Sequence, residues 1–88
     1  MAEEELPKTV EEAVNRILAG MDDADKTHVR ETPRDKLILF HHGWGTGIRN
    51  AFGLWSGNTA LLASCGEGHP DDASMVIIEA VWARLQQR

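Results

Sequence analysis

The sequence has a single cysteine, no long apolar run and no excess of basic residues, and each shortage excludes a class of protein. Because Cys65 has no second cysteine to pair with, no internal disulfide forms, which is typical of a reducing compartment. No apolar stretch approaches the roughly 18 residues that a membrane span needs. The N-terminus, MAEEELPKTV, is acidic and lacks the apolar core of a secretory leader. We therefore expect a soluble, cytoplasmic protein with no membrane partner.

The negative net charge argues against nucleic acids and anionic surfaces as partners. The 88 residues carry a formal net charge of -5, whereas nucleic acids and anionic surfaces are bound by basic faces. Hydrophobic residues make up 42% and charged residues 26%, as in an ordinary globular domain. We expect no nucleic-acid partner, an acidic flexible tail over residues 1–6 and a single helical domain over residues 7–88.

Helix signals recur along the chain, and no stretch alternates in the manner of a strand. Thr9 and Glu12 form a capping box, followed by apolar residues at helical spacing up to Gly20. Asp22 is a plausible N-cap for a short polar helix. Pro70 opens a last helix that is apolar over more than one face, which indicates a central position. The predicted fold is all-α, a compact bundle of four to five helices with the C-terminal helix at its centre.

The middle of the chain gives conflicting signals. Thr32 and Pro33 are typical of an N-cap and a first helical residue. The apolar residues that follow are spaced like one helical face: Leu37, Phe40, Trp44, Ile48, Phe52 and Trp55. Three interspersed glycines, Gly43, Gly45 and Gly47, would each cost about 1 kcal/mol inside a helix. Either one helix runs from Pro33 to about Phe52, or the helix breaks at Gly43–Gly47 and restarts near Thr46, and we favour the break. Asn58 and Gly66 should cap the next short helix at its two ends.

The residues that usually carry catalysis or bind metals are not arranged for either. His41 and His42 are adjacent, so on a helix they point about 100° apart and cannot share one metal ion. No HxxxH or HExxH pair occurs, and Cys65 has no activating neighbour. We predict no metal, no cofactor and no catalytic residue.

The glycine-rich segment GWGTG is similar to phosphate-binding loops, in which backbone amides approach an anion. It lacks the lysine of a P-loop and does not follow a strand, which excludes the P-loop and dinucleotide-binding motifs. A looser anion site remains open, built from the amides of Gly43, Gly45 and Gly47 with Arg49 and His42.

Arg49 and Asn50 are polar residues in an otherwise apolar surrounding. In a structural interpretation, which we favour, Arg49 pairs with an acid such as Glu79 or Asp72, and Asn50 bonds loop or helix-end backbone groups. In a functional interpretation, a polar cluster binds a ligand; its members would be His41, His42, Arg49 and Asn50. Four aromatic residues are expected to anchor either the core or an interface: Trp44, Phe52, Trp55 and Trp82.

The segment FHHGWGTGIRNAFGLWSGN, followed by HPDDASMVIIEAVW, resembles an uncharacterised family of short bacterial helical domains with an IRNxFGLW signature. The resemblance spans about Pro7 to Leu85, and Phe40 and Trp44 stand where leucine is expected. It implies a helical domain without an established activity. The residues that match the signature are His41, Gly43, Gly45, Ile48 to Asn50, Phe52 to Trp55, Asn58, Asp71, Ser74 and Trp82.

Three functional hypotheses follow. The favoured one is a non-catalytic protein-interaction or regulatory module with an unknown protein partner or a second copy of itself. The alternative is a small-ligand or anion-binding domain that uses the glycine-rich segment and Arg49. A weaker alternative is a small enzyme in which His41 or His42 works with a carboxylate, namely Asp71, Asp72 or Glu79. An Arg49 exposed in a concavity would favour the ligand site, and an Arg49 buried against an acid would favour the structural role.

Overall fold

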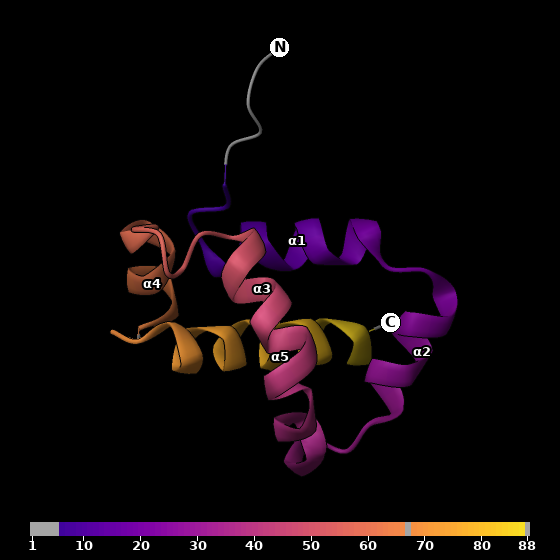
Figure 1. Ribbon diagram of the computed structural model, residues 1–88. Coiled ribbons are helices and arrows are strands. Elements are labelled where there is room, and N and C mark those ends of the chain that lie inside the picture. The colour runs from indigo at the N-terminus through magenta and orange to yellow at the C-terminus, as the bar shows by residue number, and fades with distance from the viewer. Residues whose placement is uncertain (1–5, 67, 88) are drawn as a thin grey trace.

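The computed structural model describes residues 6–66 and 68–87, and they are arranged as helices joined by short turns (Figure 1). The described residues contain no strand, which confirms the predicted all-α fold. Residues 1–5 of the predicted acidic tail lie outside the described residues. The elements are α1 (Val10–Gly20), α2 (Asp23–Glu31), the 3-10 helix η1 (Arg34–Phe40), the π-helix η2 (His41–Gly45), α3 (Thr46–Ala51), α4 (Thr59–Cys65) and α5 (Pro70–Gln86).

Helix α5 forms the centre of the bundle, as predicted from its apolar residues on more than one face. Figure 1 shows α1 running along α5 while α3 crosses α5, and α4 and α2 lie toward opposite ends of it. Four apolar residues of α5 have no exposed surface: Ala73, Ile77, Ile78 and Val81. None of the helices in the described part of the chain is both long enough and apolar enough to cross a membrane.

Short-range capping explains where α1, α2 and α4 begin and end. In each helix the side chain of the N-cap accepts a hydrogen bond from an amide three residues on, which satisfies an otherwise free donor. At the end of α4, Gly66 adopts a left-handed conformation with φ of 74°. The three N-cap bonds are Thr9 Oγ1 to the Glu12 amide at 3.1 Å, Asp22 Oδ1 to the Asp25 amide at 2.8 Å, and Asn58 Oδ1 to the Leu61 amide at 3.3 Å.

An α-helix does begin at Thr46, as predicted, but the predicted break before it is wrong, because the backbone stays helical through Gly43–Gly47. Gly45 has φ of -60° and ψ of -42°, and Thr46 has nearly the same angles. Only the type of helix changes, from 3-10 to π and then, at Thr46, to α. Trp44 and Ile48 therefore remain on the side that packs against the core.

Two further local predictions are corrected. Thr32 does not cap a following helix but closes α2, where its Oγ1 donates to the His28 carbonyl oxygen at 2.7 Å. Trp55 leaves the predicted apolar face, because Gly53 has φ of 71° and ends the helical register after Phe52. As a result Leu54 is buried and Trp55 is 57% exposed.

The glycines predict opposite responses to alanine. A Cβ atom at Gly47 would meet nothing within 4 Å, so Gly47→Ala should raise the free energy of unfolding by about 0.5–1 kcal/mol through helix propensity. A Cβ at Gly53 would lie 2.8 Å from Leu6 Cδ1 on a left-handed backbone, so Gly53→Ala should lower that free energy by about 1–2 kcal/mol. Urea unfolding followed by circular dichroism measures both. Destabilisation by Gly47→Ala would contradict the open helical geometry at that position.

Candidate functional site

Arg49 is a charged side chain inside the bundle. It extends from α3 toward the first turn of α5, and its side chain is only 7% exposed. Removing a guanidinium from water is costly unless its donors are paired. The contacts of Arg49 therefore determine what this region can do.

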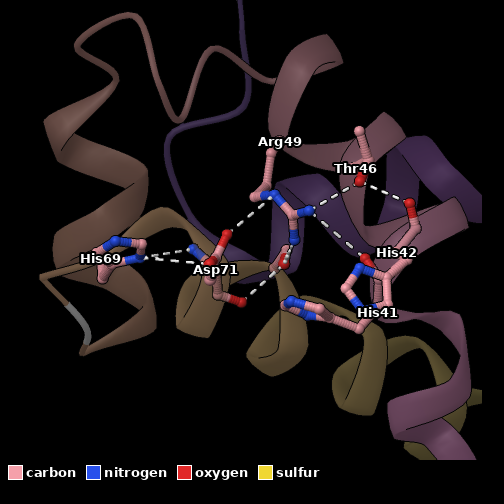
Figure 2. A network of polar contacts seen from close by, with 7 residues as sticks. His41, His42, Thr46, Arg49, His69 and Asp71 are labelled. Atoms are coloured by element: carbon pink, nitrogen blue, oxygen red, sulfur yellow. Dashed lines mark hydrogen bonds and ion pairs between the residues drawn. The ribbon is translucent and has the colours of Figure 1, made fainter.

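Three elements supply the partners of the Arg49 guanidinium (Figure 2). From α5, Ser74 Oγ accepts a hydrogen bond from Nη1 at 2.8 Å, and Asp71 Oδ1 lies 3.4 Å from Nε. From α3 itself, Thr46 Oγ1 accepts from Nη2 at 2.8 Å. From η2, the His41 carbonyl oxygen lies 3.5 Å from Nη2. We call this set, Arg49 with Asp71, Ser74, Thr46 and the His41 carbonyl, the Arg49 network.

The hydroxyl groups of the Arg49 network are themselves held in place by backbone atoms. Ser74 Oγ donates to the Asp71 carbonyl oxygen at 2.9 Å, and Thr46 Oγ1 donates to the His42 carbonyl oxygen at 2.7 Å. Each hydroxyl thus donates to backbone and accepts from the guanidinium. Such a connected set orients its members and satisfies a buried cation.

The acid that pairs with Arg49 is Asp71, whereas the sequence favoured Glu79 or Asp72. Glu79 instead faces Arg34, with Oε1 3.6 Å from Nη2. Asp72 is exposed, because on a helix it points about 100° away from its neighbour Asp71. The structural interpretation of Arg49 is thereby supported with a different partner.

Gly45 makes room for the guanidinium. A Cβ atom there would lie 3.1 Å from Arg49 Nη1 and 3.5 Å from Ser74 Oγ, closer than an ordinary contact in the first case. At Gly43 and Gly47 a Cβ would meet nothing within 4 Å. The amides of this segment belong to a helical backbone and point along its axis, so no loop converges on an anion.

The histidines and Asn50 of the predicted polar cluster are only partly brought together. His41 is half-buried, and its Nδ1 is buried without a hydrogen-bond partner among the described residues. His42 is exposed, and its ring meets that of His41 edge-on at 5.0 Å. Asn50 is exposed, and its side chain makes no hydrogen bond with another described residue. Asn50 is therefore not part of the Arg49 network.

The side-chain amide of Asn58 forms hydrogen bonds with backbone groups of two separate segments. Its Nδ2 donates to the Pro7 carbonyl oxygen at 2.9 Å and to the Phe52 carbonyl oxygen at 2.8 Å, while its Oδ1 caps α4. Only the capping was visible from the sequence, because the contact with Pro7 spans most of the chain. Trp82 makes a similar long-range tie, in which Nε1 donates to the Thr32 carbonyl oxygen at 2.8 Å.

His69 extends the Arg49 network to the surface, a role that the sequence analysis missed. Its Nδ1 accepts a hydrogen bond from the Asp71 amide at 3.1 Å and so caps α5. This bond places the proton of the neutral ring on Nε2. The exposed ring of Trp55 packs edge-on against His69, with centroids 5.6 Å apart.

Within residues 6–66 and 68–87, no three histidine, cysteine, aspartate or glutamate side chains are placed to hold a metal ion. Cys65 is buried, and its thiol donates to the Ala73 carbonyl oxygen at 3.6 Å.

A separate apolar groove opens between α1 and α2 on one side and η1, η2 and α3 on the other. It consists of two adjoining hollows of about 250 and 330 Å³ that share Met21 and Trp44. We call it the Trp44 groove, and Arg49, Asn50, His41 and His42 do not line it. Its lining is Arg16, Ile17, Gly20, Met21, Asp25, His28, Val29, Phe40, Trp44, Gly47, Ile48, Ala51 and Phe52.

Arg49→Met should lower the free energy of unfolding by about 2–4 kcal/mol. The substitution keeps an apolar stem but leaves Asp71 and the Ser74 and Thr46 hydroxyls without their donor. Urea denaturation measures the change, and the exposed neighbour supplies the control, since Asn50→Ala should change stability by no more than about 0.5 kcal/mol. An Arg49→Met protein as stable as the parent would contradict a structural role.

Comparison with known proteins identifies a family but no activity. A model for a domain of unknown function, DUF6794, matches residues 6–85. No curated protein and no solved structure matches the chain. The match covers nearly the whole chain, including the Arg49 network and the Trp44 groove. The chain belongs to the DUF6794 family, whose function is unknown.

Proposed function

We propose that this chain is a non-catalytic protein-interaction module of the bacterial cytoplasm that binds its partner through the Trp44 groove. The observation that carries the proposal is a contrast between two regions. The donors of the buried Arg49 guanidinium are paired within the Arg49 network, whereas the apolar Trp44 groove is open at the surface. Concave apolar surfaces of this kind are typical of binding sites.

The anion-binding alternative has less support, because Arg49 already has an anionic partner. A phosphate group would have to compete with Asp71 for a guanidinium that is 7% exposed. The backbone amides of Gly43, Gly45 and Gly47 are directed along a helix and do not form a cradle. Neither half of the expected anion site is therefore available at the surface.

The enzyme alternative also lacks a reactive arrangement. The carboxylate of the Arg49 network is that of Asp71, and its Oδ1 already pairs with the Arg49 guanidinium. His41 and His42 contact each other through their rings, and no carboxylate of residues 6–66 and 68–87 forms an ion pair with either ring. The positions of Asp71, His41 and His42 therefore support a binding function over a catalytic one.

Other exposed apolar side chains are second candidates for the partner surface. Ile38 is 58% exposed, Leu39 is 76% exposed and Trp55 is 57% exposed. Single exposed apolar residues are common on monomers, whereas the Trp44 groove gathers apolar side chains from five elements. We therefore favour the groove.

Site-specific photo-crosslinking in cells that produce the chain tests the proposal. A benzophenone amino acid placed at His28, which is exposed in the groove, should yield one discrete protein adduct. The same group at Ala63, which is exposed on α4 and does not line the groove, is the matched control and should yield none. Positions Leu39 and Trp55 probe the two other apolar sites.

The absence of a discrete adduct at His28, Leu39 and Trp55 alike would contradict an interaction function. Inorganic phosphate tests the alternative in parallel, and it should leave the thermal unfolding midpoint unchanged. A phosphate-dependent rise in that midpoint that Arg49→Lys abolishes would favour the anion-binding domain.

A further inference from the structure

The walls of the larger hollow of the Trp44 groove are two helical ridges. At the end of α1, Gly20 and the C-cap residue Met21 follow Ile17 by three and four positions, and all three line the hollow. From η2 and α3, the lining residues Trp44, Gly47, Ile48 and Ala51 repeat the same spacing. A groove between two such ridges accepts a third helix, whose own stripe at three- and four-residue spacing packs between them.

An extended peptide has no comparable site. Strand addition needs the free edge of a sheet, and residues 6–66 and 68–87 form no strand that could offer one. The groove chemistry therefore selects a helix with one apolar face over an extended segment.

Glycine removes the side chain where a partner backbone would come closest. Gly47 is helical and lines the groove, and a Cβ atom at this position would have no neighbour within 4 Å. The fold does not require glycine there, and alanine would favour the helix. With Ala51 one turn later, Gly47 gives α3 a low ridge that allows a short distance between helix axes.

Acidic side chains stand at one end of the groove. Asp25 lines the hollow next to Met21, and Asp22 and Asp23 are exposed immediately before it in the chain. The whole chain has a net charge of -5. A helix with lysine or arginine at the end that meets Asp22 and Asp25 would be complementary in charge.

A second copy of the chain fits this surface less well. The apolar sides of α1 and α5 already pack in the core, so neither helix is free to insert into a groove. Two chains with a charge of -5 each would also repel one another.

We propose that the Trp44 groove binds an amphipathic helix of a partner protein, with its apolar stripe over Trp44 and Gly47 and its basic end at Asp22 and Asp25. This inference rests on the proposed interaction function and adds the class of ligand. It assigns Gly47 the role of contact surface for the partner helix.

The test selects ligands from a displayed library of helical peptides against the whole chain and measures their affinity by fluorescence anisotropy. Selected peptides should carry an apolar stripe at helical spacing with lysine or arginine clustered at one end. Gly47→Gln, which fills the groove, should weaken the binding of such peptides at least tenfold. Gly43→Gln is the matched control, because Gly43 is also helical, exposed and open but does not line the groove, and it should change affinity less than twofold.

Asp25→Asn should weaken binding severalfold and reduce its dependence on salt, since it removes a carboxylate from the acidic end. Circular dichroism melting of each variant separates loss of binding from loss of fold. Selection of acidic or non-helical peptides, or affinity unaffected by Gly47→Gln in a folded variant, would overturn the proposal.

Two outcomes distinguish this inference from the function on which it rests. Cellular adducts at Leu39 or Trp55 and none at His28 would preserve an interaction function and overturn the groove assignment. A dimer in sedimentation that Gly47→Gln dissociates would replace the partner helix with a second copy of the chain. A cellular experiment without any adduct would overturn the interaction function itself.

Discussion

The buried guanidinium of Arg49 is the constraint on which the arrangement of this domain depends. Its partners come from η2, α3 and the first turn of α5, so α3 can cross α5 only where Asp71 and Ser74 meet Arg49. Gly45 leaves the space for the guanidinium. A cation enclosed in this way defines one docking geometry, since any shift of α3 would leave a buried charge without partners.

The same constraint separates the structural face of η2 and α3 from the face available to a partner. His41, Gly45 and Arg49 follow one another at four-residue spacing and face the start of α5 through the Arg49 network. Trp44, Gly47, Ile48 and Ala51 form the adjacent ridge along the Trp44 groove. The glycine-rich segment therefore serves two purposes, because Gly45 admits an internal side chain whereas Gly47 leaves the outer surface low.

Sequence reasoning succeeded where the determinants are local. The caps at Thr9, Asp22 and Asn58 each depend on residues three apart, and all were predicted. It failed where the rotation of one helix against another determines the contact. Asp71 and Asp72 point about 100° apart on α5, and only the packing of α5 against α3 determines which of them faces Arg49. Two other features also depend on tertiary structure. The left-handed Gly53 turns Leu54 inward and Trp55 outward, and the side-chain amide of Asn58 contacts residues distant in the sequence. The spacing of residues within one helix does not predict such contacts between elements.

A double-mutant cycle between Arg49 and Asp71 tests the central claim most directly. The free energy of unfolding would be measured by urea denaturation for the parent chain, Arg49→Met, Asp71→Asn and the double variant. Because the two side chains are in contact and Arg49 is buried, we predict a favourable coupling of about 1 kcal/mol or more, even with Asp71 partly exposed to solvent. Additive effects of the two substitutions would contradict the account, because they would mean that Arg49 and Asp71 stabilise the fold independently.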